Sequence, residues 1–263
     1  SFSIDGATAE SHDNFRRVNG AFASVMQAIE SVKKVGLPFQ VNTTITKHNL
    51  AELPKILDLV ISLGAVAHHP FLLVPTGRGA QLKDQEISPE EYEKSLSWFH
   101  EMRDKVPIQF KPTCAPHYYR IFRQKEKAKG VTVTPETHGL DAMSKGCMGG
   151  QSFAFVSNTG KVQICGFLDV ECGDIRKEPF HTIWDTSKVF QEMRNWDDYN
   201  GRCGYCEFRK VCGGCRARAF AFTANYMDEE PFCTYQPGET AKKARDDKKA
   251  AEAAEGVEKK VHR

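Results

Sequence analysis

The spacing of the cysteines constrains this sequence more than any other feature. Two closely spaced pairs, Cys203-x2-Cys206 and Cys212-x2-Cys215, are followed by Cys233. Thiolates two residues apart can bind one metal centre from a single turn, and intervening glycines let backbone N–H groups approach the sulfurs. Four such thiolates suit a tetrahedral zinc ion or an iron–sulfur cube. The spacing leaves both metal centres open and makes disulfides the weaker alternative.

Three more cysteines lie upstream of these pairs. Cys147, Cys165 and Cys172 surround a hairpin predicted at 153–164, so the second half of the chain holds eight of its nine cysteines. Eight thiolates are enough for two four-thiolate sites. The N-terminal residues show no secretion pattern, and clustered cysteines in intracellular proteins are more often metal ligands than disulfides. Cys114 stands apart and is interpreted as a buried free thiol.

The composition excludes several classes of protein. The chain is 40% hydrophobic and 27% charged, which is typical of a globular protein and not of collagen, a coiled coil or full disorder. Its 36 Lys and Arg residues nearly balance 34 Asp and Glu, giving a net charge of +2. No apolar run approaches the ~20 residues that a membrane span needs. We therefore expect a cytoplasmic protein that binds neither nucleic acid nor membrane.

The first half of the sequence alternates between strand and helix patterns. Apolar spacing predicts the following elements in order: a helix at 20–35 after a polar loop, a strand at 39–46, a helix at 50–63 capped by Asn49, a strand at 65–74, a helix from Ser88 to about 105 with a capping box to Glu91, a short strand at 108–111 and a helix at 116–129. This rhythm indicates parallel strands joined by helical crossovers. The loop at 75–79 follows a strand's C-terminal end, where open α/β folds bind ligands.

The composition and the periodicity of the sequence change from about residue 131, where the apolar periodicity weakens and Cys and Gly become frequent. Short apolar runs with metal-type spacing indicate a small domain organised around metal. We therefore predict an α/β domain at 1–135 and a cysteine-rich domain at 136–237. Residues 238–263 are rich in Lys, Glu and Ala, which indicates a solvated or frayed helix or a disordered tail.

The order of the cysteines resembles the SPASM extension of radical S-adenosylmethionine (SAM) enzymes. The matching pattern is Cys147, Gly160-x4-Cys165, the two pairs at 203–215 and then Cys233. One departure is that two residues, and not the usual three, precede Cys215. In the first half, 3–6 resembles the end of the family's fourth barrel strand and 42–46 its fifth. The resemblance, over 1–237, implies the C-terminal part of a partial (β/α)6 radical SAM barrel followed by a small Cys-rich SPASM domain.

The resemblance also implies cofactors and ligands. One or two auxiliary [4Fe-4S] clusters would be bound by two sets of cysteines. By analogy with the family, the first set is Cys147, Cys165, Cys172 and Cys215, and the second set is Cys203, Cys206, Cys212 and Cys233. SAM contacts would come from the two strand motifs, namely Ser3, Asp5, Asn42 and Thr44. Because alternate residues of a strand face the same side, Asn42 and Thr44 are expected to share the barrel interior.

Three segments, 68–79, 113–120 and 212–219, are similar to the SAM-dependent heme synthases of the siroheme-based heme pathway. These enzymes oxidatively decarboxylate two propionates of iron-coproporphyrin III to vinyl groups, through a 5′-deoxyadenosyl radical, and make heme b. The resemblance implies an iron-porphyrin substrate, a low-potential electron donor and a monomer. The side chains we select as candidate substrate contacts are His68, His69, Arg78, His117, Tyr118 and Arg120.

The family's SAM-cluster signature, three cysteines with spacing x3 and x2, does not occur in the 263 residues. The chain opens on Ser1-Phe2-Ser3-Ile4, without Met, in what resembles the end of a strand. We therefore expect that an N-terminal portion with the SAM-binding cluster is missing, and that the chain as printed does not cleave SAM.

Other functions stay open at this point. Relatives that process heme d1 precursors or didecarboxysiroheme share the motifs, and SPASM enzymes that modify peptides share the cysteine pattern. A zinc-ribbon binding module fused to a partial α/β domain is the alternative that is not an enzyme. Bound porphyrin would distinguish a tetrapyrrole-processing enzyme from a peptide-modifying one. Metal content would distinguish the zinc-ribbon module from the enzymes.

Overall fold

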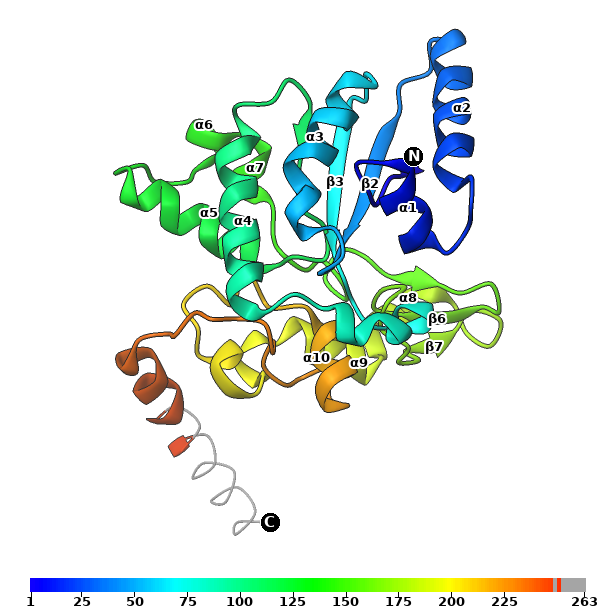
Figure 1. The fold of residues 1–263 in the computed structure, drawn as a ribbon. Helices are drawn as coiled ribbons and strands as arrows, with labels where there is room; N and C mark the ends of the chain where they lie inside the picture. The colour runs from blue at the N-terminus through cyan, green and yellow to red at the C-terminus, as the bar shows by residue number, and fades with distance from the viewer. Residues whose placement is uncertain (248–249, 252–263) are drawn as a thin grey trace. The chain divides into compact units, whose positions relative to one another are not determined.

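A computed structural model describes residues 1–247 and 250–251. The chain divides into two compact units, Ser1–Met143 and Ser144 onward (Figure 1). The sequence placed this boundary at about residue 135. Each unit is described by itself, and none of the helices in the described part of the chain is long and apolar enough to cross a membrane.

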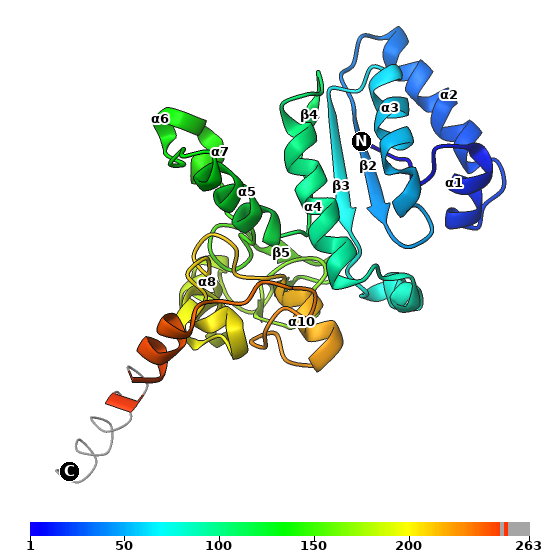
Figure 2. The ribbon, with the colours of Figure 1, turned by 60° about the vertical axis from the view of Figure 1, so that its left-hand side comes forward.

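The first unit is built on a four-stranded parallel sheet with the order β1-β2-β3-β4. The strands are β1 (Phe2–Ser3), β2 (Gln40–Ile45), β3 (Ala67–Leu72) and β4 (Gln109–Phe110). The segments between and after them are α1 (Ala9–Arg16), α2 (Ala21–Lys34), η1 (Leu50–Glu52), α3 (Leu53–Ser62), η2 (Gly77–Gln85), α4 (Pro89–Arg103), α5 (His117–Ala128), α6 (Pro135–His138) and α7 (Leu140–Met143). Figure 2 shows β2 and β3 side by side with α3 next to them. The parallel α/β prediction is confirmed.

The sheet is covered by helices on the face that carries its apolar residues. In β2, Val41, Thr43 and Ile45 are buried while the residues between them are half-buried, as the two-residue period of a strand requires. Val41 packs with Ile56 of α3 and Ile29 of α2. The apolar stripes of these helices at i, i+3 and i+4 therefore meet one face of the sheet, and the opposite face is left to polar residues.

Two local predictions in this unit were wrong. The segment after Gly6 was predicted as a polar loop, but it forms α1, whose first turn is capped by Thr8 accepting a hydrogen bond from Ser11 N at 3.2 Å. This helix has no apolar stripe, so periodicity could not reveal it. Asn49 does not cap a helix; its side chain instead binds the backbone N–H of Thr46, at 2.9 Å, and two carbonyls at the end of the sheet. The predicted capping box of Ser88 and Glu91 is confirmed.

The second unit contains short elements. A three-stranded antiparallel sheet comprises β5 (Phe155–Val156), β6 (Lys161–Gln163) and β7 (Gly173–Asp174), and β5 and β6 form the predicted hairpin. The remaining elements are α8 (Phe180–Thr186), α9 (Lys188–Arg194), η3 (Trp196–Asp198), η4 (Gly201–Gly204), α10 (Arg216–Thr223) and a helix at 239–247. The prediction for the tail from 248 onward lies largely outside the described residues. The helix at 239–247 agrees with the helical alternative predicted for 238–263, whereas α8, α9 and α10 were not predicted, because they are too short to show a period.

Candidate functional site

A row of polar side chains crosses all four strands of the first unit. Ser3 is paired in register with Asn42, and Asn42 with His69. Lys111, just after β4, continues the row because its backbone N–H donates to His68 O at 3.2 Å. Residues in register on parallel strands share a face, so these four half-buried side chains lie together opposite the helix-covered face. Thr44 belongs to the same face, one row further along the strands, as predicted for Asn42 and Thr44.

The end of this row at the β4 edge carries positive charge. Burial, and then the nearby Lys111 ammonium, hold the pKa of His69 below its usual value, so the imidazole is neutral at pH 7. Lys111 forms no ion pair within the part of the chain that the structure describes, and its Nζ lies 5.6 Å from the centre of the Tyr119 ring. The row therefore offers one unpaired ammonium beside one neutral imidazole. Lys111 was not predicted, because only its place on the strand shows which way it faces.

Asp5 has a structural position at the end of β1. Its carboxylate is fully buried, accepts a hydrogen bond from Thr44 N at 2.7 Å and pairs with Arg16. Burial raises the pKa of Asp5, and the Arg16 charge opposes that shift. Its backbone N–H donates to His12 Nδ1 at 3.1 Å. Asp5 thus ties α1 to the ends of β1 and β2, and its oxygens are committed within the protein.

His68 and His69 face opposite sides of the sheet. His68 is 1% exposed, its Nε2 lies 2.8 Å from Thr43 Oγ1, and its ring stacks on Phe110 with centroids 5.4 Å apart. Burial lowers the pKa of His68 to about 3. Adjacent residues of a strand point to opposite faces, so His68 and His69 cannot both contact the same ligand. The structure gives His68 a packing position in the helix-covered core.

The other candidate substrate residues do not converge. Arg120 is buried and holds the carboxylate of Glu93 through two hydrogen bonds, one of 2.9 Å. His117 is buried with its ring 5.0 Å from that of Tyr92. Arg78 is exposed on η2. The Arg120 guanidinium thus already has a carboxylate partner within the protein, and its contact with a propionate stays a prediction.

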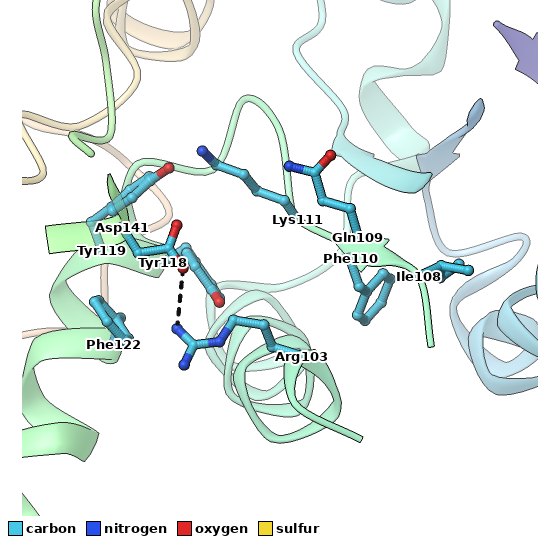
Figure 3. A pocket seen from close by; sticks show the side chains of 9 residues that line it. All are labelled: Arg103, Ile108, Gln109, Phe110, Lys111, Tyr118, Tyr119, Phe122 and Asp141. Carbon is cyan, nitrogen blue, oxygen red and sulfur yellow. Dashed lines mark ion pairs between the residues drawn. The ribbon is translucent and has the colours of Figure 1, made fainter. Parts of the chain in front are cut away.

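A cavity of about 130 Å³ opens at the β4 edge (Figure 3). It is lined by Arg103, Ile108, Gln109, Phe110, Lys111, Tyr118, Tyr119, Phe122 and Asp141. Arg103 Nη1 is 3.8 Å from a carboxylate oxygen of Asp141, so its charge is partly compensated. Burial raises the pKa of Tyr118 to about 12, which keeps its hydroxyl protonated. The cavity therefore places a hydroxyl donor and the Lys111 ammonium around a space of carboxylate size.

In the second unit, three cysteines of the first predicted set interact with one another. The Cys147 thiol interacts electrostatically with Cys165 and with Cys215, and Cys165 interacts with Cys215. Cys172 lies further along the same hairpin sheet, just before β7, with its Sγ 3.8 Å from Val170 O. These cysteines come from the segment before β5, the end of β6 and the start of α10, so only the tertiary fold joins them.

Cysteines of the second predicted set also gather. The Cys206 thiol interacts electrostatically with both Cys203 and Cys233. Cys212 lies in the same loop, where its backbone N–H donates to Phe208 O at 2.8 Å. Cys147, Cys165 and Cys215 thus interact with one another, and Cys206 interacts with Cys203 and Cys233, while the assignment of all eight cysteines to two sets stays a prediction.

Backbone N–H groups point at these sulfurs. Glu230 N lies 3.4 Å from Cys203 Sγ. The other thiols that accept backbone hydrogen bonds are Cys147 from Gly149, Cys165 from Phe167 and Leu168, Cys172 from Ile164, Cys206 from Phe208 and Cys215 from Arg218. Hydrogen bonds to the sulfurs are a property of iron–sulfur sites and raise the cluster's reduction potential.

The donor set of eight thiolates suits iron–sulfur clusters. None of the nine cysteines, all of which the structure describes, forms a disulfide. Burial raises the pKa of Cys206 to about 12 and of Cys215 to about 11, so ligation must displace protons.

Comparison with known proteins agrees with this geometry. Residues 147–216 match the SPASM family model, described as an iron-sulfur cluster-binding domain. The chain is 52% identical over 238 residues to an AdoMet-dependent heme synthase of Methanosarcina barkeri, covering 90% of this chain and 68% of that one. It is 52% identical over 237 residues to the enzyme of that name from Oleidesulfovibrio alaskensis, covering 90% and 61%.

The solved structures give the same fold. SuiB of Streptococcus suis, crystallised with S-adenosylmethionine, superposes with a TM-score of 0.62 at 12% identity, covering 89% of this chain and 53% of that one. The radical SAM fold and the cysteine-rich extension are therefore confirmed. The chain spans 61% to 68% of the length of the two curated relatives. It belongs to the family of AdoMet-dependent heme synthases, radical SAM enzymes with an iron–sulfur cluster-binding SPASM domain.

Proposed function

We propose that this protein acts in heme biosynthesis by converting two propionates of iron-coproporphyrin III to vinyl groups. The observation that carries the proposal is the 52% identity, over 90% of the chain, to a protein named AdoMet-dependent heme synthase. The proposed low-potential electron donor, the monomeric state and the cytoplasmic location come from the same family resemblance.

SAM would lie against the polar face of the first unit. Ser3 and Asn42 are neighbours in register on β1 and β2, and the Gln40 amide donates to Asn42 Oδ1 at 3.2 Å. Thr44 follows on the same face. Asp5 acts behind this face by binding Thr44 N, which fixes the end of β2. We therefore propose Ser3, Asn42 and Thr44 as SAM contacts and Asp5 as a residue that positions them.

The clusters would be held by the eight cysteines of the second unit in the two sets described above. SAM with its reduced cluster would supply the radical chemistry of this family, in which each propionate would lose carbon dioxide, one hydrogen atom to the 5′-deoxyadenosyl radical and one electron to an auxiliary cluster. The protein's own contribution is to orient the porphyrin and to hold the carboxylates that do not react.

The porphyrin carries four propionates, of which two are retained. A carboxylate bound to a full cation is stabilised as the anion and gives up carbon dioxide less readily. Lys111, with neutral His69 beside it and the Tyr118 hydroxyl in the same cavity, therefore suits a retained propionate. Arg78 is the remaining exposed candidate for another.

The first test is a titration of the protein with iron-coproporphyrin III, followed by the absorption of the bound porphyrin. We expect Lys111→Met to weaken binding about tenfold, because a hydrogen bond to a charged group contributes roughly 1.5–3 kcal/mol. Lys105→Met, an exposed lysine in the turn before β4, is the matched control and should change nothing. The tetramethyl ester of the porphyrin lacks the charges and should be insensitive to Lys111→Met. Equal binding by Lys111→Met and wild type contradicts the assignment of Lys111.

The second test is metal content after anaerobic purification. About eight iron and eight sulfide per chain support two four-iron clusters, and about four of each support one. One or two zinc ions without sulfide would favour the binding-module alternative.

Turnover is then assayed on a protein that also carries the Cys-x3-Cys-x2-Cys signature. Vinyl products from iron-coproporphyrin III support the proposal, whereas turnover only of didecarboxysiroheme, a heme d1 precursor or a peptide contradicts it.

A further inference from the structure

Arg216 is a fully buried cation at the first residue of α10, directly after Cys215. It is 1% exposed, and its Nη1 donates to Tyr226 O at 3.2 Å and to Asp228 O at 2.6 Å. The guanidinium carbon lies 4.6 Å from the centre of the Tyr199 ring. Its Nε has no hydrogen-bond partner among the described residues. Two backbone carbonyls and a ring thus orient this cation without neutralising it.

The Arg216 guanidinium faces thiols of both cysteine sets. Its Nη2 lies 3.6 Å from Cys203 Sγ, which belongs to the second set. It also interacts electrostatically with the thiol of Cys147, which belongs to the first set. Tyr199, on which the guanidinium stacks, interacts with the same two thiols. Arg216 therefore lies between the two sets.

Glu230 is the buried carboxylate of this region and also touches both sets. Its side chain accepts a hydrogen bond from Cys215 N at 2.6 Å, while its backbone N–H lies 3.4 Å from Cys203 Sγ. The carboxylate pairs with Arg218 at 3.4 Å, and Glu230 and Arg218 are both 0% exposed. Two buried cations and one buried anion leave one positive charge in the interior. Burying a charge is costly unless an opposite charge lies nearby.

The local sequence makes room for this cation. Gly214 has a φ of +65°, and a Cβ there would lie 2.3 Å from Arg216 Nη2 and 2.9 Å from Glu230 Cβ. A side chain at 214 would therefore displace the guanidinium. Gly214 therefore allows both the turn between Cys212 and Cys215 and the position of the Arg216 side chain.

We propose that Arg216 is a buried cation that raises the reduction potential of both iron–sulfur sites, with Glu230 acting in the opposite direction. The proposal rests on the proposed function only in requiring that both cysteine sets hold clusters. Reduction of a cluster adds one negative charge, which a nearby cation stabilises and a nearby anion opposes. Because Arg216 faces a thiol of each set, its charge favours the reduced form at both sites. The surplus positive charge in the interior is compensated once iron–thiolate clusters are bound.

The test measures the reduction of the two clusters by a spectroscopic redox titration of the iron-loaded chain. We expect Arg216→Gln to make both clusters at least tenfold harder to reduce, which is 59 mV for a one-electron couple. Arg216→Lys keeps the charge and should recover most of the shift. Arg194→Gln is the matched control, since Arg194 also donates to two backbone carbonyls and stacks on Trp184, 4.5 Å from the ring centre. Among the described residues no cysteine interacts with Arg194, so Arg194→Gln should change neither reduction potential.

Glu230→Gln tests the same idea with the opposite sign, and it keeps the proposal testable if Arg216→Gln fails to load iron. We expect both clusters of Glu230→Gln to become easier to reduce, because Arg218 and Arg216 lose their compensating anion. Iron and sulfide are counted in every sample. A loaded Arg216→Gln or Glu230→Gln in which the reduction equilibria of both clusters stay within threefold of wild type, or in which one reduction potential alone changes, overturns the role of Arg216 at both sites and leaves the proposed function standing. Wild-type protein with four or fewer iron atoms overturns both the two-cluster proposal and this role of Arg216.

Discussion

The two units bury charged side chains in different surroundings. Around β1 and β2 of the first unit the core is aliphatic, with Ile4, Val41 and Ile56 fully buried. Among the described residues, the largest fully buried side chains are Arg216 and Arg218, and both belong to the second unit. The first unit also buries charged groups such as Asp5 and Arg120, each paired with an opposite charge, but its aliphatic core adds apolar burial, which contributes roughly 25 cal/mol per Å². The second unit buries charge and thiols around short elements, and such an interior gains its stability from bound metal.

Removal of iron is expected to have the largest effect, because it should destabilise the second unit and leave the stability of the first unit unchanged. We expect chelation under anaerobic conditions to speed amide hydrogen exchange at buried amides of 144–247 by about a thousandfold, or about 4 kcal/mol. Exchange in 1–143 should stay within a few-fold of the loaded protein. Equal protection of the second unit with and without iron would show that its interior is stable by itself.

The converse experiment perturbs the aliphatic core. Ile56→Ala should destabilise the first unit by about 2–5 kcal/mol, because it leaves a cavity beside Val41 and Ile29. The half-buried Ile61 of the same helix is the control, and Ile61→Ala should cost less. Denaturant unfolding measures the loss, and iron content should not change. A drop in iron content with Ile56→Ala would show that the units are not independent.

Acid should weaken the first unit through His68. Its pKa is about 3 when folded and near 6.5 when unfolded, so the contribution is complete above pH 6.5 and is lost as the pH falls toward 3. Between pH 7 and pH 5 this amounts to about 2 kcal/mol, at 1.36 kcal/mol per pH unit below 6.5. His68→Gln should flatten this slope in a stability-versus-pH series, whereas His181→Gln, at an exposed position, should leave it intact. An unchanged slope in His68→Gln would place the acid sensitivity elsewhere.

The smallest effect concerns the two glycines of the cysteine loop. Gly213 and Gly214 both have positive φ, +70° and +65°, so alanine is strained at either position. Only at Gly214 would a Cβ collide with Arg216, whereas at Gly213 the nearest atom is at an ordinary 3.5 Å. We expect Gly214→Ala to cost about 1 kcal/mol more than Gly213→Ala, measured as a lower melting temperature of the loaded protein. Equal melting temperatures would mean that Arg216 can move aside at no cost.

Sequence patterns predicted the elements that depend on long regular periods. The helices at 21–34, 53–62, 89–103 and 117–128 and the strand at 40–45 appear close to their predicted ranges. The helix α1 was missed because it has no apolar stripe and is anchored by Thr8 and by His12 beside Asp5. The helices α8, α9 and α10 of the second unit were missed for another reason, since seven or eight residues are too few to show a helical period.

The candidate site divides in the same way. Cysteine spacing predicted a metal-organised second domain, because two thiolates on one turn need only local backbone geometry. The row of Ser3, Asn42, His69 and Lys111 needed the register of four strands. The neighbouring histidines could not be told apart by residue type, and only the pleat shows that His68 enters the core.

The sequence by itself determined the family, the parallel α/β order and the two closely spaced cysteine pairs, because each depends on neighbours along the chain. The tertiary structure alone decided which residues from distant segments meet. It commits Arg120 to Glu93, leaves Lys111 unpaired within the described residues, and buries Arg216 between Cys147 and Cys203. The physical reason is that a charge takes its role from what surrounds it after burial, and burial follows from strand register and packing that local spacing does not encode.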